Sequence, residues 1–319
     1  MLKVAILSGW HVHAEGYTKD FISRKDVQVT AMWDENSVRG KAFAEKFAIN
    51  FEPDLGALLK RNDVDAVCVN TPTSMHRDVI VKAASAGKHI FTEKVLALTS
   101  AECAEIKAAI EKNGVKFCIS FPHRTLSHNL FAKKVVDEQL LGKVTYLRMR
   151  NAHNGASAGW LPEHFYNEAE CGGGAMIDLG AHPMYLIPWL LGKPAKMSST
   201  FTSVTGRGVE DNAVCVMSYE NGTIAVSETG FVSSNSPAVL ELHGTEGSLI
   251  IVNGDIWMLP DKSESIKLPK ALPTAIDQFV DGILHGSEII FGIDDAIILT
   301  EMMEAAYSAH KTKETVCLR

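Results

Sequence analysis

The sequence predicts two domains: an α/β domain with a parallel sheet, followed by an α+β domain with a predominantly antiparallel, open sheet. Three observations lead to this fold class. The 319 residues suffice for two domains of about 100–200 residues each. Short apolar runs alternate with helical segments in the first part of the chain, and successive strand patterns follow later. We place the boundary near Pro122, which gives domains of residues 1–121 and 122–319.

The first domain begins with alternating strands and helices. Runs rich in Val, Ile, Phe or Ala predict strands at residues 3–8, 27–33, 66–70, 89–92 and 116–120. Apolar residues at helical spacing predict helices at residues 38–47, 74–86 and 101–112. Gly87 and Gly114 end two of these helices, and either Thr99 or Ser100 is in position to cap the last one. This order predicts a parallel sheet with right-handed crossovers.

The second domain has a different pattern. Expected helices lie at residues 127–140, 274–284 and 294–310, with a further helical stretch that ends at Leu191. Expected strands lie at residues 144–150, 213–220, 223–231, 239–244 and 248–252. The dipeptide Asn221-Gly222 between two of these strands is a strong hairpin signal. Strands joined by tight turns pair antiparallel, so the second sheet is expected to be mainly antiparallel.

Composition excludes several classes of protein. The net charge is -7 and no cluster of Lys and Arg forms a basic patch, so we expect neither nucleic acid nor a membrane surface as a partner. No apolar run approaches the roughly 20 residues that span a bilayer. The six cysteines contain no C-x-x-C pair, which disfavours zinc-ribbon and thioredoxin-type sites and favours a reducing, cytoplasmic compartment.

The carboxyl ends of the predicted parallel strands form the edge where open α/β sheets bind ligands. The first end is S-G-W-H-V-H-A at residues 8–14, which lacks the G-x-G-x-x-G pattern that lets backbone amides approach a pyrophosphate. Asp34 ends the second strand, where a carboxylate accepts hydrogen bonds from an adenosine ribose and repels a 2′-phosphate; capping of the next helix is the alternative. Asn70-Thr71-Pro72 ends a further strand and is either part of this edge or an ordinary turn.

Four motifs are more specific. They are T-P-T-S-M-H at residues 71–76, G-K-H-I-F-T-E-K-V at 87–95, G-G-G followed by D-L-G-A-H within 172–182, and E-A-A-Y at 304–307. In order and spacing they resemble the Gfo/Idh/MocA family over nearly the whole chain. The resemblance implies a Rossmann domain, a substrate domain with an open antiparallel sheet, and NAD(P)-dependent oxidation or reduction of a sugar, polyol or related hydroxyl. Val95, where the family has proline, and the altered first loop depart from its pattern.

Hydride transfer at a carbinol carbon needs a base for the hydroxyl proton, and reduction needs the reverse. We predict His182 as this acid/base because imidazole titrates near neutral pH, with Lys94 as a donor to the same oxygen. Asp178, four residues earlier on a helix, would lie on the same face and orient the ring or bind a second hydroxyl. The predicted cofactor-binding residues are Ser8, Gly9, Trp10, His11, Asp34, Thr71, Pro72, His76, Glu93 and Lys94, with NAD favoured over NADP. The family's cleft-lining segments imply Arg124, His153 and Trp160 as substrate contacts.

His11 and His13 allow two interpretations. On a strand the two side chains would face the same side and could ligate a metal, whereas on a turn they would diverge. We favour a structural or substrate-facing role and predict no metal site.

The sequence therefore predicts an NAD-dependent dehydrogenase or reductase for a sugar or polyol. The altered first loop leaves one alternative, a non-catalytic sensor or regulatory protein that kept the fold. The paired histidines leave another, a metal-dependent lyase or hydrolase. A net lyase or epimerase outcome through an internal redox cycle also fits the leading hypothesis. The exposed face of an open sheet favours a homo-oligomer, a dimer or tetramer packed through the second domain's sheet.

Overall fold

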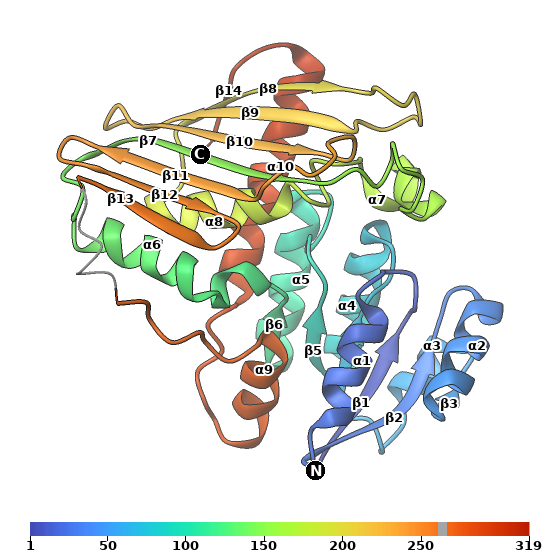
Figure 1. The fold of residues 1–319 in the computed structure, drawn as a ribbon. Helices are drawn as coiled ribbons and strands as arrows, with labels where there is room; N and C mark the ends of the chain where they lie inside the picture. The colour runs from blue at the N-terminus through green and yellow to red at the C-terminus, as the bar shows by residue number, and fades with distance from the viewer. Residues whose placement is uncertain (261–266, 319) are drawn as a thin grey trace. The chain divides into compact units, whose positions relative to one another are not determined.

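The computed structural model describes residues 1–260 and 267–318, and the chain divides into two compact units (Figure 1). The first unit comprises Met1–Ser120 and Pro273–Ile297, and the second comprises Phe121–Leu272 and Ile298–Arg319. The first unit is thus built from two separate stretches of chain. The domain boundary near Pro122 stays a prediction, and the packing adds that residues 273–297 group with the first unit.

The described part of the first unit contains a six-stranded sheet in the order β3-β2-β1-β4-β5-β6. Its strands are β1 (Leu2–Leu7), β2 (Val27–Trp33), β3 (Asn50–Phe51), β4 (Ala66–Val69), β5 (His89–Thr92) and β6 (Phe117–Ile119). All neighbouring strands pair in parallel, which confirms the predicted α/β class. The chain extends from β1 to one side of the sheet and then returns to the other side at β4. The carboxyl ends of β1 and β4 therefore flank the switch point, where open sheets of this kind bind ligands.

The helices of the first unit begin and end near their sequence signals. They are α1 (Ala14–Ser23), α2 (Ser37–Phe47), α3 (Leu55–Leu59), α4 (His76–Ser85), α5 (Ser100–Asn113) and α9 (Ala275–Leu284). The hydroxyl of Thr99 accepts from the Glu102 amide and the Glu102 carboxylate accepts from the Thr99 amide, so Thr99 is the cap of α5. Gly114 ends α5 with a φ of 62°. Strand residues such as Val4 and Phe91 are fully buried and form the core.

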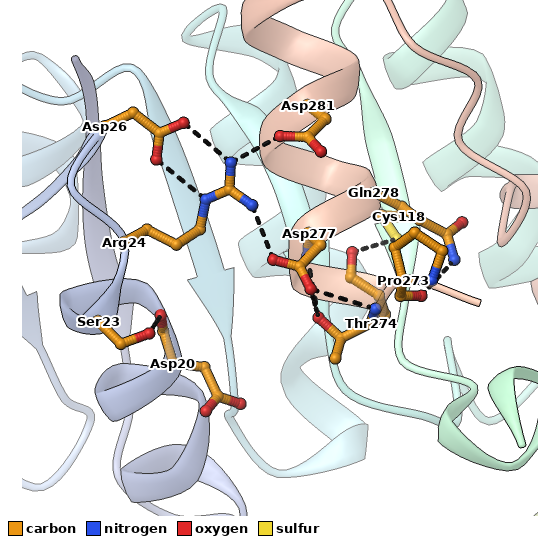
Figure 2. Close-up of polar contacts among 11 residues, drawn as sticks. Asp20, Ser23, Arg24, Asp26, Cys118, Pro273, Thr274, Asp277, Gln278 and Asp281 are labelled. Atoms are coloured by element: carbon orange, nitrogen blue, oxygen red, sulfur yellow. Dashed lines mark hydrogen bonds and ion pairs between the residues drawn. The ribbon is translucent and has the colours of Figure 1, made fainter. Parts of the chain in front are cut away.

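Arg24 attaches α9 to the amino-terminal part of the first unit (Figure 2). Its guanidinium donates to both carboxylate oxygens of Asp26, at 3.0 and 2.9 Å, and to Asp277 at 2.7 Å and Asp281 at 2.6 Å. Thr274 caps α9 with the help of the same Asp277. Because several charges share one guanidinium, this network stabilises the unit more than an isolated surface pair would. It adds to the apolar packing of α9, in which the buried ring of Phe279 lies 5.8 Å from that of Phe91.

The described part of the second unit contains an eight-stranded sheet in the order β13-β12-β11-β7-β10-β9-β8-β14 (Figure 1). Its strands are β7 (Val144–Ala152), β8 (Lys196–Thr202), β9 (Asn212–Ser218), β10 (Ile224–Gly230), β11 (Val239–Gly244), β12 (Ser248–Val252), β13 (Asp255–Leu259) and β14 (Val316–Cys317). Only β7 and β10 pair in parallel among these described strands, which confirms a mainly antiparallel sheet. The predicted hairpin at Asn221-Gly222 joins β9 to β10, and Gly222 has a φ of 87°.

One face of this second sheet is buried. Along β9 the side chains of Ala213, Cys215 and Met217 are buried, whereas Val214 and Val216 are exposed. The accompanying helices are α6 (Ser127–Asp137), α7 (Glu168–Cys171), α8 (Ala181–Leu191) and α10 (Ile293–Thr312), which belongs to this unit from residue 298 on. Helix α8 packs against β7 and β10 and covers the buried face.

Two expectations from composition can be compared with the structure. All six cysteines lie in the described part of the chain as free thiols, and five of them are buried. No helix within residues 1–260 and 267–318 combines the length and the apolar character that crossing a bilayer requires.

Candidate functional site

Four loops meet at the carboxyl edge of the first unit's sheet because they follow neighbouring strands. The loop at residues 8–13 follows β1, Asp34 follows β2, Asn70 follows β4 and Glu93 follows β5. The amide of His11 donates to the Asn70 carbonyl at 3.2 Å, which joins the first of these loops to the third. The predicted cofactor-binding residues all lie in this unit, and all of them are buried except Gly9, which is half-buried.

Asp34 holds the first loop in position. Its side chain is 0% exposed, and each of its two carboxylate oxygens accepts two hydrogen bonds. One oxygen accepts from the Gly9 amide at 2.8 Å and from Arg39 Nε at 3.0 Å. The other accepts from the Asn36 amide and from Arg39 Nη2, both at 2.7 Å. Asn36 itself caps α2, so helix capping does not explain Asp34. These four bonds use the capacity of the carboxylate, which anchors Gly9 to the end of β2.

At the same edge, Glu35 has a carboxylate oxygen that accepts no hydrogen bond from the described residues. Its Oε1 contacts Arg39 Nη2, whereas its buried Oε2 has no hydrogen-bond partner among the described residues. Burial, together with the charge of Asp34, raises the pKa of the Glu35 carboxyl. The buried hydroxyl of Thr71, at the end of β4, likewise lacks a partner within the described part of the chain. Buried polar atoms are normally satisfied, so two such atoms at a ligand-binding edge fit a polar ligand there.

His76 ties two of the edge loops together. One ring nitrogen lies 3.0 Å from the Thr71 carbonyl and the other lies 2.9 Å from the Val95 carbonyl. The ring is 1% exposed and is enclosed between the loops that follow β4 and β5. His76 therefore supports the loops from within, and its direct contact with a cofactor stays a prediction.

Glu93 lies at the centre of a cluster of charged and polar groups. Its Oε2 is 3.3 Å from His13 Nδ1 and accepts a hydrogen bond from the Tyr17 hydroxyl, which lies 2.7 Å from Ser120 Oγ. Burial raises the pKa of the Glu93 carboxyl, but the charges of His11, His13 and Lys94 outweigh it and hold that pKa well below its ordinary value. The carboxylate is therefore ionised. Sequence reasoning missed Tyr17, although its place four residues after His13 was a usable signal.

In the second unit, Glu210 organises the glycine segment. Its Oε1 accepts from the amides of Gly174 and Met176, both at 2.9 Å, and from the hydroxyl of Tyr307 at 2.6 Å. A Cβ on Gly173 would collide with the Tyr307 side chain, and one on Gly174 with the Glu210 backbone, so both positions need glycine. Burial raises the pKa of the Glu210 carboxyl, and its hydrogen bonds offset this only in part. Sequence analysis did not predict Glu210, because no motif marks it.

Asp178 precedes helix α8 instead of lying on it, which corrects the expectation that Asp178 and His182 share a helix face. Helix α8 begins at Ala181, and Asp178 lies in the turns that follow the glycines. Its amide donates to the Gly174 carbonyl at 3.1 Å. The hydrogen bonds of Glu210 hold this segment in turns, so the helix starts later than the spacing predicts.

His182 is placed by two aromatic neighbours. It lies in the first turn of α8, is 7% exposed, and its Nδ1 is 3.0 Å from the hydroxyl of Tyr185. The same hydroxyl accepts a hydrogen bond from the His123 amide at 3.1 Å. The rings of His123 and His182 stack with centroids 4.1 Å apart and an interplanar angle of 14°. Sequence reasoning missed both Tyr185 as a partner and His123, which also lines a cavity of about 300 Å³ between the sheet and helices α6 and α8.

The predicted substrate contacts do not share one environment. The ring of His153 lies 4.6 Å from that of Trp160. Burial lowers the pKa of His153, and the nearby charge of Asp178 offsets this only in part. Trp160 is 55% exposed. Arg124, in contrast, is buried, with its guanidinium 5.2 Å from the ring centre of Trp189. The structure therefore groups His153, Trp160 and Asp178, whereas Arg124 packs inside the unit.

Two family models match the chain. The model described as "Oxidoreductase family, NAD-binding Rossmann fold" matches residues 8–121. The model described as "GFO/IDH/MocA C-terminal domain" matches residues 130–250. The two matches occur in the order of the two predicted domains and cover most of the chain.

Known proteins show the same likeness. The chain is 28% identical to the 1,5-anhydro-D-fructose reductase of Ensifer adhaerens over 231 residues, which cover 70% of this chain and 68% of the relative. It is 30% identical to the scyllo-inositol 2-dehydrogenase (NAD(+)) of Bacillus subtilis (strain 168) over 207 residues, 61% of this chain and 57% of the relative. The solved structure of GenD2 from gentamicin A biosynthesis, in complex with NAD, has a TM-score of 0.86 at 22% identity and covers 100% of this chain and 96% of that chain. This last likeness concerns the fold.

We predict that Glu210→Gln is tolerated at pH 7, whereas Glu210→Leu costs about 2–4 kcal/mol of stability because three buried donors lose their acceptor. Gln keeps the Oε1 acceptor and removes the buried charge. Since the pKa of Glu210 is raised in the folded state, the folded protein binds the extra proton, and the wild type gains stability relative to Glu210→Gln as the pH falls from 7 towards 5.

Thermal unfolding of the three proteins between pH 5 and 8 checks this prediction. We expect the unfolding temperature of Glu210→Gln to fall further below that of the wild type as the pH is lowered. A difference that instead grows as the pH is raised would contradict a raised pKa of Glu210.

Proposed function

Because the chain belongs to the Gfo/Idh/MocA family of oxidoreductases, we propose that it transfers a hydride between a nicotinamide dinucleotide and a hydroxyl or carbonyl carbon of a sugar, a polyol or a related small molecule. The observation that carries the proposal is the NAD-binding Rossmann match over residues 8–121. Lys94 follows β5 and His182 lies in the first turn of α8, at the motif positions of the family. The substrates named for the two relatives, a sugar derivative and an inositol, support this substrate class.

In this proposal His182 is the acid/base and Lys94 donates a hydrogen bond to the reacting oxygen. Nδ1 of His182 lies 3.0 Å from the Tyr185 hydroxyl, and we assign the proton exchange with the substrate to Nε2. Tyr185 and the stacked ring of His123 hold the imidazole in one orientation. Asp178 binds a second substrate hydroxyl, with His153 and Trp160 nearby as further contacts. When bound, the nicotinamide accepts or supplies the hydride.

The first unit offers the groups that would hold the dinucleotide. The edge contains two buried acceptors, Glu35 Oε2 and Thr71 Oγ1, that lack partners among the described residues, and a polar ligand would satisfy them. Pro72 and Lys94 border the same edge. Since Asp34 already accepts four hydrogen bonds, we assign the ribose hydroxyls to Glu35 and keep Asp34 as the anchor of Gly9.

NAD is the favoured cofactor on charge. Asp34 and Glu35 both pair with Arg39, so the group carries a net negative charge at the end of β2. A 2′-phosphate placed there would meet two carboxylates and one guanidinium that is already engaged. The alternative of a non-catalytic sensor is supported only by the altered first loop, and turnover of any carbohydrate with NAD would exclude it.

We further propose that copies of the chain assemble through the outer face of the second sheet. The exposed side chains of this face include Val214, Val216, Ile224 and Trp257. Arg148 lies between Glu228, at 2.8 Å, and Glu241, at 3.3 Å, on the neighbouring strands. An apolar face with paired charges suits burial against a second copy.

We predict that His182→Gln and Lys94→Met each lower kcat about 100-fold or more without unfolding the protein, because each removes a group assigned to the reacting oxygen. Steady-state assays with NAD and a panel of sugars and polyols, with circular dichroism of each variant, provide the measurement. His285→Gln and Lys82→Met are matched controls, since both side chains are exposed and lie outside the site. Full activity in both test variants would overturn the assignment.

We predict that Glu35→Gln reduces the preference for NAD over NADP about tenfold, because one of the two negative charges that would repel a 2′-phosphate is lost and Arg39 keeps only Asp34 as a charged partner there. The measurement is the ratio of the two dissociation constants by calorimetry. Glu45→Gln, on an exposed face of α2, is the control. An unchanged ratio in Glu35→Gln would exclude Glu35 as the discriminating group.

We predict that Val216→Lys shifts the chain to a smaller assembly, because lysine cannot be desolvated in an apolar interface. Light scattering after size exclusion measures the mass. Val204→Lys, exposed outside the strands, is expected to leave the mass unchanged. A wild type that is monomeric at micromolar concentration would refute the proposed assembly.

A further inference from the structure

His11, His13 and Glu93 form a set of potential metal ligands at the carboxyl edge of the first unit. One ligand atom from each of the three residues lies within 4.8 Å of the others. We propose that they bind one divalent transition-metal ion, with Zn²⁺ as the ion they fit best. Hydride transfer requires no such ion, so the proposal does not rest on the proposed function. It replaces the expectation from the sequence that the two histidines bind no metal.

The separation between the ligand atoms of His13 and Glu93 suits a tetrahedral ion. Bonds of about 2.0–2.1 Å around tetrahedral zinc place the ligand atoms about 3.3–3.4 Å from one another. His13 Nδ1 and Glu93 Oε2 are 3.3 Å apart, so one edge of the tetrahedron already has this length. The rings of His11 and His13 lie with centroids 4.6 Å apart. Nδ1 of His11 accepts a hydrogen bond from the His13 amide at 3.2 Å, which ties the two candidate ligands together.

The type of ligand selects the class of metal. Two imidazoles and one carboxylate suit zinc and neighbouring transition ions, whereas Mg²⁺ and Ca²⁺ prefer oxygen ligands. Three protein ligands leave a fourth position for water or for an oxygen of a bound molecule. The His13 side chain is 45% exposed, which gives an ion a route to the buried carboxylate of Glu93.

A supporting shell holds the carboxylate. The hydroxyl of Tyr17 donates to Glu93 Oε2 and lies 2.7 Å from Ser120 Oγ, so the ligand oxygen is positioned from α1 and from the end of β6. Hydrogen bonds of this kind orient the side chains that ligate a metal, and their removal commonly changes metal affinity 10–100-fold.

A second cluster provides an internal comparison. Asp26, Asp281 and His285 also bring ligand atoms within 4.8 Å of one another. Both carboxylates, however, already accept hydrogen bonds from Arg24 (Figure 2). The guanidinium of Arg24 already supplies the positive charge in that cluster, so we expect the cluster to bind no zinc.

The test uses the full chain, stripped with a chelator and titrated with Zn²⁺ by calorimetry, with Co²⁺ absorption as a probe of coordination geometry. We expect one equivalent of Zn²⁺ and a tetrahedral Co²⁺ spectrum. His13→Ala and Glu93→Gln should each weaken Zn²⁺ binding at least about 100-fold, and Tyr17→Phe about tenfold. His285→Ala is the matched control and should bind like the wild type. Circular dichroism verifies that each variant folds. Because the His13 side chain is partly exposed, His13→Ala removes fewer packing contacts than a change at the buried Glu93.

Sub-stoichiometric binding by the wild type, unchanged affinity in His13→Ala, or loss of binding in His285→Ala would each overturn the metal site. NADH binding is measured separately on the same samples. Turnover with NAD in a protein that binds no zinc would refute the metal site and leave the proposed function standing. Zinc binding without any dinucleotide binding would support the metal site and refute the proposed function.

Discussion

The site in the first unit depends on one geometric constraint: neighbouring parallel strands end at the same edge of their sheet. The order β2-β1-β4-β5 brings together loops that are far apart in the sequence. Hydrogen bonds then lock them to one another, from the Gly9 amide to Asp34 and from the His11 amide to Asn70. The acceptors that lack partners among the described residues, the ionised Glu93 and the imidazoles lie at one edge of the sheet because of this order of strands and not because of any local sequence preference.

Side-chain hydrogen bonds hold the first loop, whose sequence lacks the glycine pattern. Ser8 adopts a φ of 76°, in the region that glycine usually occupies, and its hydroxyl accepts from the Trp10 amide at 3.1 Å. Asp34 holds Gly9, against which Phe43 packs so closely that a Cβ would lie 2.8 Å from its ring. Hydrogen bonds of the Ser8 and Asp34 side chains thus hold the backbone of this loop, which places the imidazoles of His11 and His13 next to the carboxylate of Glu93.

In the second unit a buried carboxylate has the equivalent organising role. Glu210 gathers two amides and the Tyr307 hydroxyl, and the glycines allow these groups to approach closely. The segment that follows places Asp178 in a turn and begins α8 at Ala181, so that His182 lies within hydrogen-bond distance of the Tyr185 hydroxyl. The sheet behind it is buried on one face, which fixes α8, and exposed on the other. One carboxylate therefore links the carboxyl-terminal helix to the placement of the proposed acid/base.

The sequence by itself determined the fold class, the hairpin at Asn221-Gly222, the helix end at Gly114 and the family motifs, because caps, turns and periodicity act over a few residues. It left the cap of α5 open between two neighbours, and the reciprocal hydrogen bonds between Thr99 and Glu102 identify Thr99 as the cap. Only the tertiary structure decided that Asp34 is saturated, that Glu93 meets His13 across 80 positions, and that Tyr307 reaches Glu210 across 97. Such contacts follow from strand order and close packing, which no local pattern specifies.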